Sequence, residues 1–284
     1  MEIKKVLVIG AGQMGGGIAQ VVAQAGVEVL LNDYKEENID ARIDFIASLL
    51  EKNVSKGKMT SEEKDGVLSK ISACPNTKDA KDVDLVIEAI VENMDVKKAL
   101  LKDLSEVLSD DAIFASNTSS LSITELATAY KKPENVIGMH FFNPVPVMKL
   151  VEIIRGIGTS DETYEAIKAL GEKIGKTTVE IKDFPGFAVN RILVPMINEA
   201  INTLYTGVAS VEDIDNAMKL GANHPMGPLA LADFIGLDTI YSILNVLYEG
   251  FGDQKYAPSP LLRNYIRAGW LGKKSGKGFY DYSK

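Results

Sequence analysis

The sequence predicts an α/β protein in which a doubly wound parallel sheet with an inserted helical arm precedes an all-helical domain. Up to about residue 185, short apolar strands alternate with helical stretches, which is the pattern of such a sheet. After the second strand, residues 36–71 form a longer helical stretch than a single crossover needs. Strand signals stop after residues 183–186, and only helical segments follow. We therefore expect two domains, 1–185 and 186–284.

The first strand is expected over residues 4–9, and it leads directly into the run Gly10-Ala11-Gly12-Gln13-Met14-Gly15. Gly10 permits a tight turn, Gly12 lets the backbone approach a pyrophosphate, and Gly15 lets helix and strand pack closely. A helix continues over residues 18–25, and its N-terminus offers free N–H groups and a partial positive charge to phosphates. Strand, turn and helix in this order predict a dinucleotide-binding site.

The second strand is expected over residues 27–33, and its last residue is the acid Asp33. In the Rossmann dinucleotide-binding fold, an acid at this place binds the ribose hydroxyls of the cofactor. Its carboxylate would repel the 2′-phosphate of NADP, so NAD is the expected cofactor and NADP is less favoured. Lys35, two residues further on, weakens that preference because its charge is opposite.

The helical arm, about residues 36–71, is expected to hold two helices, and Thr60 with Glu63 forms a capping-box start for the second. Lys52 and Lys56 are four residues apart, so on a helix they share a face. On an acidic protein they could bind a phosphate-bearing substrate. From the charge pattern alone, an ordinary solvated helix end is the favoured alternative.

Further strands and helices complete both domains. Strands are expected over residues 85–89, 112–115 and 177–181, with helices over 95–108 and 162–174. In the C-terminal domain, helices are expected over residues 187–205, 211–220, 228–235, 238–248 and 260–268. Pro195 lies inside the first of these helices and should kink it or displace its start.

A candidate acid–base pair lies on either side of a proline-rich turn. Short apolar strands are expected at residues 136–137 and 150–154, and Pro146 lies six residues from both His140 and Glu152. If the chain doubles back near Pro146, the imidazole faces the carboxylate. A carboxylate that holds one ring nitrogen fixes the tautomer and stabilises the imidazolium, which leaves the other nitrogen for a substrate proton. The alternative is a core histidine paired with a buried glutamate for structure alone.

Other polar candidates lie at the ends of expected elements. Asn117 and Ser119 follow a strand, at the sheet edge where ligands bind in open α/β proteins. Glu92 and Lys97 follow the strand at 85–89 and could reach the cofactor. Asn190 opens the helical domain, next to a domain boundary of the kind that favours ligand binding. Loop and helix-capping roles are the alternatives for Asn117, Ser119 and Asn190.

Composition favours a soluble enzyme. The net charge is −8, which makes nucleic acid and anionic membranes poor partners. No apolar stretch is long enough to span a bilayer, and the first strand begins too early for a signal segment, so we expect a cytoplasmic protein. The single Cys74 suits a reducing compartment and is interpreted as incidental, and His224 as structural. No cluster of metal ligands is evident.

Taken together, the motifs resemble those of the short-chain L-3-hydroxyacyl-CoA dehydrogenase family over essentially the whole chain. The runs that carry the resemblance are Gly10-Ala11-Gly12-Gln13-Met14-Gly15, Ser116-Asn117-Thr118-Ser119-Ser120, Gly138-Met139-His140-Phe141-Phe142-Asn143-Pro144, residues 183–191 and Pro225-Met226-Gly227-Pro228. The resemblance implies reversible NAD(H)-dependent oxidation of a short-chain 3-hydroxyacyl-CoA, such as (S)-3-hydroxybutyryl-CoA, to the 3-ketoacyl-CoA. It also implies a homodimer formed through the helical domain.

The resemblance also implies roles for individual residues. The catalytic residues would be His140, Glu152, Ser119 and Asn190. The cofactor-binding residues would be Gly10, Gly12, Gln13, Met14, Gly15, Asp33, Glu92, Lys97 and Asn117. The substrate-binding residues would be Ser119, Asn143, Asn190, Lys52 and Lys56, the two lysines contacting coenzyme A. Two other functions remain open: a non-catalytic NAD-binding structural protein, and a dehydrogenase of small sugar acids.

Overall fold

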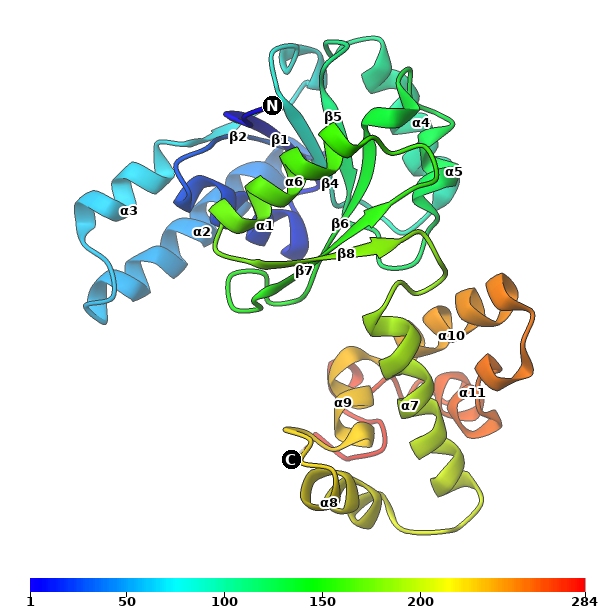
Figure 1. The fold of residues 1–284 in the computed structure, drawn as a ribbon. Coiled ribbons are helices and arrows are strands. Elements are labelled where there is room, and N and C mark those ends of the chain that lie inside the picture. The colour runs from blue at the N-terminus through cyan, green and yellow to red at the C-terminus, as the bar shows by residue number, and fades with distance from the viewer. Residues whose placement is uncertain (284) are drawn as a thin grey trace. The chain divides into compact units, whose positions relative to one another are not determined.

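The computed structural model describes residues 1–283, and the chain divides into two compact units between Phe184 and Pro185. The first unit holds a single eight-stranded sheet, in the spatial order β3-β2-β1-β4-β5-β6-β7-β8 (Figure 1). The strands are β1 (Lys5–Ile9), β2 (Glu28–Asn32), β3 (Ile71–Ala73), β4 (Leu85–Glu88), β5 (Ile113–Ser116), β6 (Val136–Phe141), β7 (Leu150–Arg155) and β8 (Thr177–Lys182). The first six strands therefore follow the order of a Rossmann fold.

All neighbouring strands are parallel except β6 and β7, which are antiparallel. The predicted doubly wound parallel sheet is thus confirmed for β1 to β6, and the chain reverses direction after β6. The strand order turns back between β1 and β4, so the carboxyl ends of these two strands border a crevice of the kind that binds ligands in open sheets.

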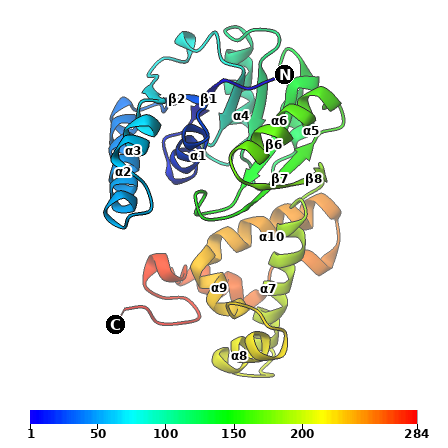
Figure 2. The same ribbon diagram turned by 60° about the vertical axis from the view of Figure 1, so that its left-hand side comes forward.

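Helices cover both faces of this sheet. They are α1 (Gln13–Gln24), α2 (Glu36–Ser55), α3 (Ser61–Leu68), α4 (Met94–Ser105), α5 (Ile123–Ala127) and α6 (Asp161–Lys173), with short 3₁₀ turns at Thr77–Asp79 and Pro133–Asn135. Buried residues of α1 and α6 share one apolar cluster with alternate strand residues such as Val8 and Leu31. Figure 2 shows α4 and α5 on the other side of the sheet. Period-2 alternation in the strands therefore gives each face its own apolar layer.

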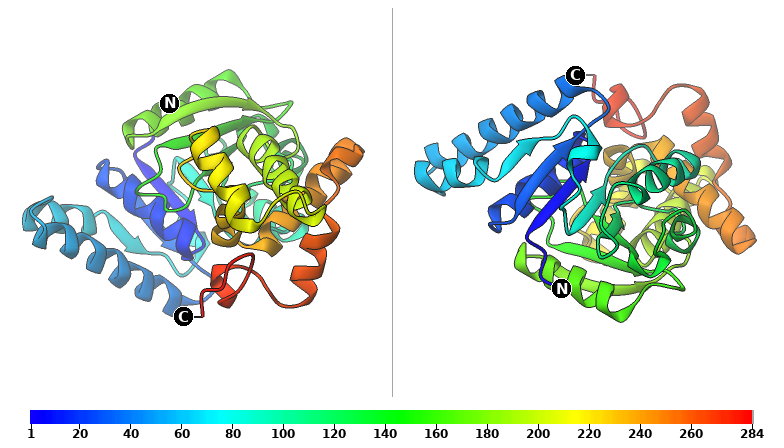
Figure 3. Two further views of the ribbon diagram at one scale, coloured as in Figure 1. Left: turned by 90° about the horizontal axis from the view of Figure 1, so that it is seen from below. Right: turned by 90° about the horizontal axis from the view of Figure 1, so that it is seen from above.

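The predicted helical arm is present as α2 and α3, which lie side by side and project beyond the sheet (Figure 3). The capping box at Thr60 is confirmed: its side chain accepts from Glu63 N, and the Glu63 side chain accepts from Thr60 N. The prediction that helix extends to residue 71 was wrong. Ile71 instead begins β3, which pairs with Val29 of β2, because three residues beside a neighbouring strand gain ladder hydrogen bonds that a short pattern does not reveal.

The second unit is all-helical, as predicted. Its helices are α7 (Val189–Tyr205), α8 (Val211–Gly221), α9 (Pro228–Ile235), α10 (Leu237–Phe251) and α11 (Pro260–Arg267), with 3₁₀ turns at Gln254–Tyr256 and Lys273–Ser275. Pro195 lies inside α7, whose first helical residue is Val189. Within residues 1–283, no single helix is long and apolar enough to cross a membrane, and α9 with α10 passes that test only as a pair bent by 97°.

Two buried aspartates fasten the C-terminal segment of this unit. Asp233 is fully buried and accepts hydrogen bonds from the backbone N–H groups of Phe279 and Tyr280, at 2.9 Å each, and from the Tyr282 hydroxyl at 3.2 Å. Burial raises the pKa of Asp233 above its ordinary value. Asp215 accepts from the first N–H groups of α9 and, at 2.8 Å, from the Tyr280 hydroxyl.

Candidate active site

The glycine run forms the turn between β1 and α1. Gly10 has φ of +104°, and a Cβ there would lie 2.5 Å from the Ala89 carbonyl oxygen. A Cβ at Gly15 would overlap the Gly10 carbonyl, so this glycine lets α1 pack against the turn. At Gly12 a Cβ would meet nothing within 4 Å, and this N-cap residue makes no side-chain cap. The turn therefore presents open space and uncapped N–H groups at a helix N-terminus, which fits a pyrophosphate.

Asp33 lies directly beyond β2 and beside this turn. Its carboxylate accepts hydrogen bonds from Ala11 N at 2.8 Å, from Asn38 Nδ2 at 2.9 Å and from Lys35 N at 3.2 Å. Burial acts to raise the pKa of Asp33, but these hydrogen bonds outweigh it and the pKa is lowered. A cavity of about 770 Å³, lined in part by Gly12, Asp33, Pro75, Ile90 and Leu100, lies alongside. An anionic carboxylate beside an apolar cavity fits the ribose and adenine of a dinucleotide.

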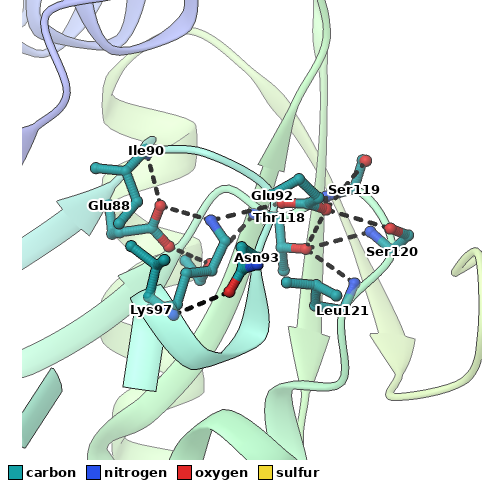
Figure 4. A network of polar contacts seen from close by, with 11 residues as sticks. Glu88, Ile90, Glu92, Asn93, Lys97, Thr118, Ser119, Ser120 and Leu121 are labelled. Carbon is teal, nitrogen blue, oxygen red and sulfur yellow. Dashed lines mark hydrogen bonds and ion pairs between the residues drawn. The ribbon is translucent and has the colours of Figure 1, made fainter. Parts of the chain in front are cut away.

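A buried polar network follows the carboxyl ends of β4 and β5 (Figure 4). Glu88 is fully buried, and its carboxylate accepts from Lys97 Nζ at 2.6 Å, Ser116 Oγ at 2.7 Å and Ile90 N at 2.7 Å. Glu88 carries a buried charge that sequence reasoning did not single out, and Ser116, quoted there only as part of a motif, carries a buried hydroxyl. Because both oxygens of the Glu88 carboxylate accept hydrogen bonds, this network fixes the loop that follows β4.

Glu92, on that loop, contacts the segment after β5. Its carboxylate accepts from Thr118 Oγ1 at 2.6 Å, from Ser119 N at 2.9 Å and from Ser119 Oγ at 3.3 Å. The structure therefore brings the predicted residues Glu92 and Ser119 together at one edge of the sheet (Figure 4).

Lys97, predicted to reach the cofactor, lies inside this loop network. It is only 1% exposed, and its ammonium group lies 2.6 Å from Glu88 and 3.5 Å from Glu92. Its ammonium group is placed to hold Glu92, and its contact with the cofactor stays a prediction. The sequence pattern of α4 did not predict that Lys97 is buried, because its partner Glu88 lies on the preceding strand β4.

Asn117 links the ends of β5 and β6. Its backbone N–H donates to the Glu88 carbonyl at 2.8 Å, and its Oδ1 accepts from Phe141 N, also at 2.8 Å. This second bond fixes the backbone next to His140. Asn117 therefore couples the loop network to the strand that carries the histidine.

His140 and Glu152 are direct partners across the antiparallel strands β6 and β7. Nδ1 of His140 lies 2.8 Å from Oε2 of Glu152, and the residues are 6% and 0% exposed. Their neighbours Met139 and Phe141 point into the apolar layer shared with α1 and α6, so the pair points to the opposite face. The predicted meeting of the two side chains is confirmed. β6 is longer than predicted and includes His140, because pairing with β7 extends the strand.

Lys52, Lys56 and Asn143 line one pocket of about 400 Å³, between α2 and the turn after β6. Gln13 Nε2 donates to Asn143 Oδ1 at 2.9 Å, which ties this turn to the start of α1. Arg42 also lines the pocket and was not among the predicted residues. The two lysines therefore share a concave surface with the Asn143 turn, rather than a plain helix end.

Asn190 belongs to the second unit, as the second residue of α7, where the turn before the helix brings Arg191 N to the Gly186 carbonyl at 3.1 Å. His224 lies in the loop between α8 and α9, and its N–H donates to the Met218 carbonyl at 3.2 Å. Cys74 is buried, and burial raises the pKa of its thiol. Within residues 1–283, no three His, Cys, Asp or Glu side chains are grouped as a metal site requires.

Comparison with known proteins identifies the family. The family model for the NAD binding domain of 3-hydroxyacyl-CoA dehydrogenase matches residues 5–184, and the model for its C-terminal domain matches residues 186–282. A probable 3-hydroxybutyryl-CoA dehydrogenase of Bacillus subtilis is 57% identical over 284 residues, which cover 100% of this chain and 99% of the relative. The 3-hydroxybutyryl-CoA dehydrogenase of Bradyrhizobium diazoefficiens is 57% identical over 280 residues, 99% of this chain and 96% of that protein.

A solved structure agrees with these relatives. The crystal structure of (S)-3-hydroxybutyryl-CoA dehydrogenase from Ralstonia eutropha has a TM-score of 0.98 and 49% sequence identity, and the match covers 100% of both chains. The chain therefore belongs to the 3-hydroxyacyl-CoA dehydrogenase family, oxidoreductases that act on CH–OH groups and whose N-terminal domain binds NAD.

Proposed function

We propose that the protein catalyses the reversible, NAD(H)-dependent oxidation of (S)-3-hydroxybutyryl-CoA to acetoacetyl-CoA. The observation that carries this proposal is the buried His140–Glu152 pair, with 2.8 Å between Nδ1 and Oε2, in a chain of the 3-hydroxyacyl-CoA dehydrogenase family. The names of relatives at 57% identity support the acyl chain proposed.

His140 is the proposed general base for oxidation and the general acid for reduction. A bound nicotinamide would supply the acceptor for the hydride that leaves C3 of the substrate. The C3 hydroxyl must lose its proton at the same time, and a positioned imidazole is the common acceptor for such a proton. The bond to Glu152 engages Nδ1, so Nε2 is the nitrogen that exchanges the proton with substrate.

Glu152 is proposed to hold the imidazole ring and to stabilise its charge. A carboxylate at Nδ1 keeps the proton on that nitrogen, which leaves Nε2 as the acceptor. When His140 takes the substrate proton, the imidazolium forms 2.8 Å from a buried negative charge. Because His140 and Glu152 are buried partners on the paired strands β6 and β7, their geometry is fixed before the substrate binds.

Ser119 and Asn190 are proposed to orient the C3 oxygen and the acyl chain. Orientation of the substrate supplies a large part of the rate enhancement in such reactions. Ser119 is held by two hydrogen bonds to Glu92, so its hydroxyl has a defined position. For Asn190, the support is its place at the start of α7 and the family motif around it.

The cofactor is proposed to lie along the carboxyl ends of β1 and β4. The turn from Gly10 to Gly15, with Gln13 and Met14, would hold the pyrophosphate, and Asp33 the adenosine ribose. Glu92 and Asn117 would contact the nicotinamide half, with Lys97 supporting Glu92 from behind. Asp33 favours NAD over NADP.

Lys52 and Lys56 are proposed to bind the phosphates of coenzyme A, with Asn143 on the opposite side of their pocket. This substrate carries several negative charges, and the protein has a net charge of −8, so it needs a local basic surface to dock. A sugar acid without coenzyme A would have no use for this surface, which favours the acyl-CoA.

The second unit is proposed to form the contact of a homodimer in the cytoplasm. It exposes large apolar side chains, among them Ile192 on α7 at 73%, Leu220 on α8 at 86%, and Val208 in the turn between these helices at 72%. Apolar surface of this extent on a charged protein commonly marks a contact with another chain. A single buried cysteine suits a reducing compartment.

A steady-state assay of acetoacetyl-CoA reduction, with NADH and NADPH in parallel, tests the function. We expect rapid turnover with NADH and weaker turnover with NADPH. NADH binding without turnover on any 3-ketoacyl-CoA would support the non-catalytic alternative. Oxidation of small sugar acids in place of acyl-CoA would support the other alternative.

A further inference from the structure

Arg42, on α2, faces the glycine turn from the side opposite Asp33. Its Nε donates to the Ala11 carbonyl at 2.8 Å, while the Ala11 N–H donates to Asp33 Oδ2, also at 2.8 Å. A single residue of the cofactor-binding turn is thus held by a guanidinium at its carbonyl and by a carboxylate at its N–H. The two opposite charges flank the place where the ribose hydroxyls are proposed to bind.

The Arg42 side chain is held in place along its length. Its guanidinium carbon lies 5.2 Å from the centre of the Phe45 ring, and a Cβ at Gly16 would overlap its stem, so α1 leaves room for it only because Gly16 has none. Through residues 1–283, the two terminal nitrogens of Arg42 make no hydrogen bond and no ion pair. A fixed guanidinium therefore keeps its two terminal NH₂ groups available for an anion.

Arg42 and Asp33 line the same cavity of about 630 Å³, together with Gly12 and Asn38. Beside the 2′-oxygen of an adenosine ribose, a carboxylate favours a hydroxyl and repels a phosphate. A guanidinium has the opposite preference, because it binds phosphate through paired N–H donors. Lys35 also lies near Asp33, but its ammonium group lies over the Tyr34 ring, 5.5 Å from the ring centre.

We propose that Arg42 is a specificity residue of the cofactor site. Its guanidinium is placed to bind the 2′-phosphate of NADP, but the carboxylate of Asp33 repels that phosphate and prevents the binding. The preference for NAD then depends on the balance of two side chains, and removal of Asp33 alone should expose the NADP site. This inference rests on the proposed function, in which Asp33 holds the adenosine ribose.

The test is the binding of 2′,5′-ADP and of ADP, measured by calorimetry, to wild type and to Asp33→Ser, alone and combined with Arg42→Gln or with Lys35→Ala. Asp33→Ser should bind 2′,5′-ADP about 10–100-fold more tightly than wild type does, the range of a charge-assisted bidentate contact. Adding Arg42→Gln should remove that gain while ADP binding changes less than about threefold. Adding Lys35→Ala, the matched control, should leave the gain in place.

The same variants should be assayed with NADPH and acetoacetyl-CoA. Asp33→Ser should raise kcat/KM for NADPH, and the addition of Arg42→Gln should remove that increase. Three results would overturn the proposal: a gain that survives Arg42→Gln, a gain lost with Lys35→Ala, or an equal loss of ADP binding in the Arg42 variant. A raised KM for acetoacetyl-CoA with unchanged 2′,5′-ADP binding would also overturn it, since Arg42 would then serve the substrate. If instead the proposed function fails, no variant will reduce acetoacetyl-CoA, yet the nucleotide-binding measurements still report on Arg42.

Discussion

The exchange of Glu152 for glutamine isolates one property of the proposed acid–base pair, its charge. The His140 and Glu152 side chains are buried cross-strand partners with 2.8 Å between Nδ1 and Oε2. Glutamine has nearly the same size and its amide oxygen can still accept a hydrogen bond from Nδ1. The fold and the ring position should therefore persist, while the negative charge beside the proton-accepting ring disappears.

The expected magnitude follows from Coulomb's law. At 2.8 Å and an effective dielectric constant of about 20, opposite unit charges attract by about 6 kcal/mol, which is an upper bound. The imidazolium is only partly formed in the transition state, and about half of its charge corresponds to about 3 kcal/mol. Because about 1.4 kcal/mol is a tenfold change in rate, kcat for Glu152→Gln should fall about 10²-fold.

Steady-state reduction of acetoacetyl-CoA by NADH measures this effect, with thermal denaturation as the check on folding. The control is Glu180→Gln on the neighbouring strand β8, an exposed glutamate that undergoes the same chemical change, and it should retain kcat within about twofold. The reasoning would be refuted by a folded Glu152→Gln variant that keeps more than about half of the wild-type kcat.

The other predictions concern proton transfer, substrate docking, assembly and stability. His140→Ala should lose about 10²–10⁴-fold in kcat while fluorescence titration still detects NADH binding, and retention of more than about a tenth of kcat would exclude His140 as the acid–base group. Lys52→Ala combined with Lys56→Ala should raise KM for acetoacetyl-CoA severalfold and flatten its salt dependence, with little effect on an N-acetylcysteamine thioester that lacks the phosphates; equal losses on both substrates would instead indicate a disturbed arm. Light scattering at micromolar concentration should give a dimer of the 30.8 kDa chain, and a stable monomer would contradict the proposed contact. Asp233→Ala removes the acceptor of three hydrogen bonds and should lower the free energy of unfolding by about 2–3 kcal/mol in denaturant titrations, whereas Asp44→Ala on the exposed side of the arm should change it by less than about 0.5 kcal/mol.

Much of the fold was predictable because its signals are local. The glycine run needs its glycines for reasons that act over a few residues: the positive φ at Gly10 and the close approach at Gly15. The capping box at Thr60 and the helical periodicity of the second unit are equally local, and both were predicted. The pairing of His140 with Glu152 was also within reach of the sequence. A hairpin about a central proline places residues at equal distance from the turn opposite one another.

The partners of buried charges were not predictable in this way. Lys97 had the pattern of a surface lysine, and Glu88 that of an ordinary strand end, yet they form a buried ion pair at 2.6 Å. Asp233, near the end of α9, accepts hydrogen bonds from residues 46 and 47 positions further along the chain. β3 was missed because three residues form a strand only beside a neighbour that supplies their hydrogen bonds.

The sequence by itself therefore determined the nature of most elements, the two-part organisation and the identity of the chemical groups, because turns, caps and periodicity depend on neighbouring residues. The tertiary structure alone decided which charges are buried, which side chains support Glu92, and that Arg42 and Asp33 hold the same residue of the cofactor-binding turn. The physical reason is that burial and electrostatic pairing depend on what packs around a side chain, and those neighbours come from distant parts of the chain.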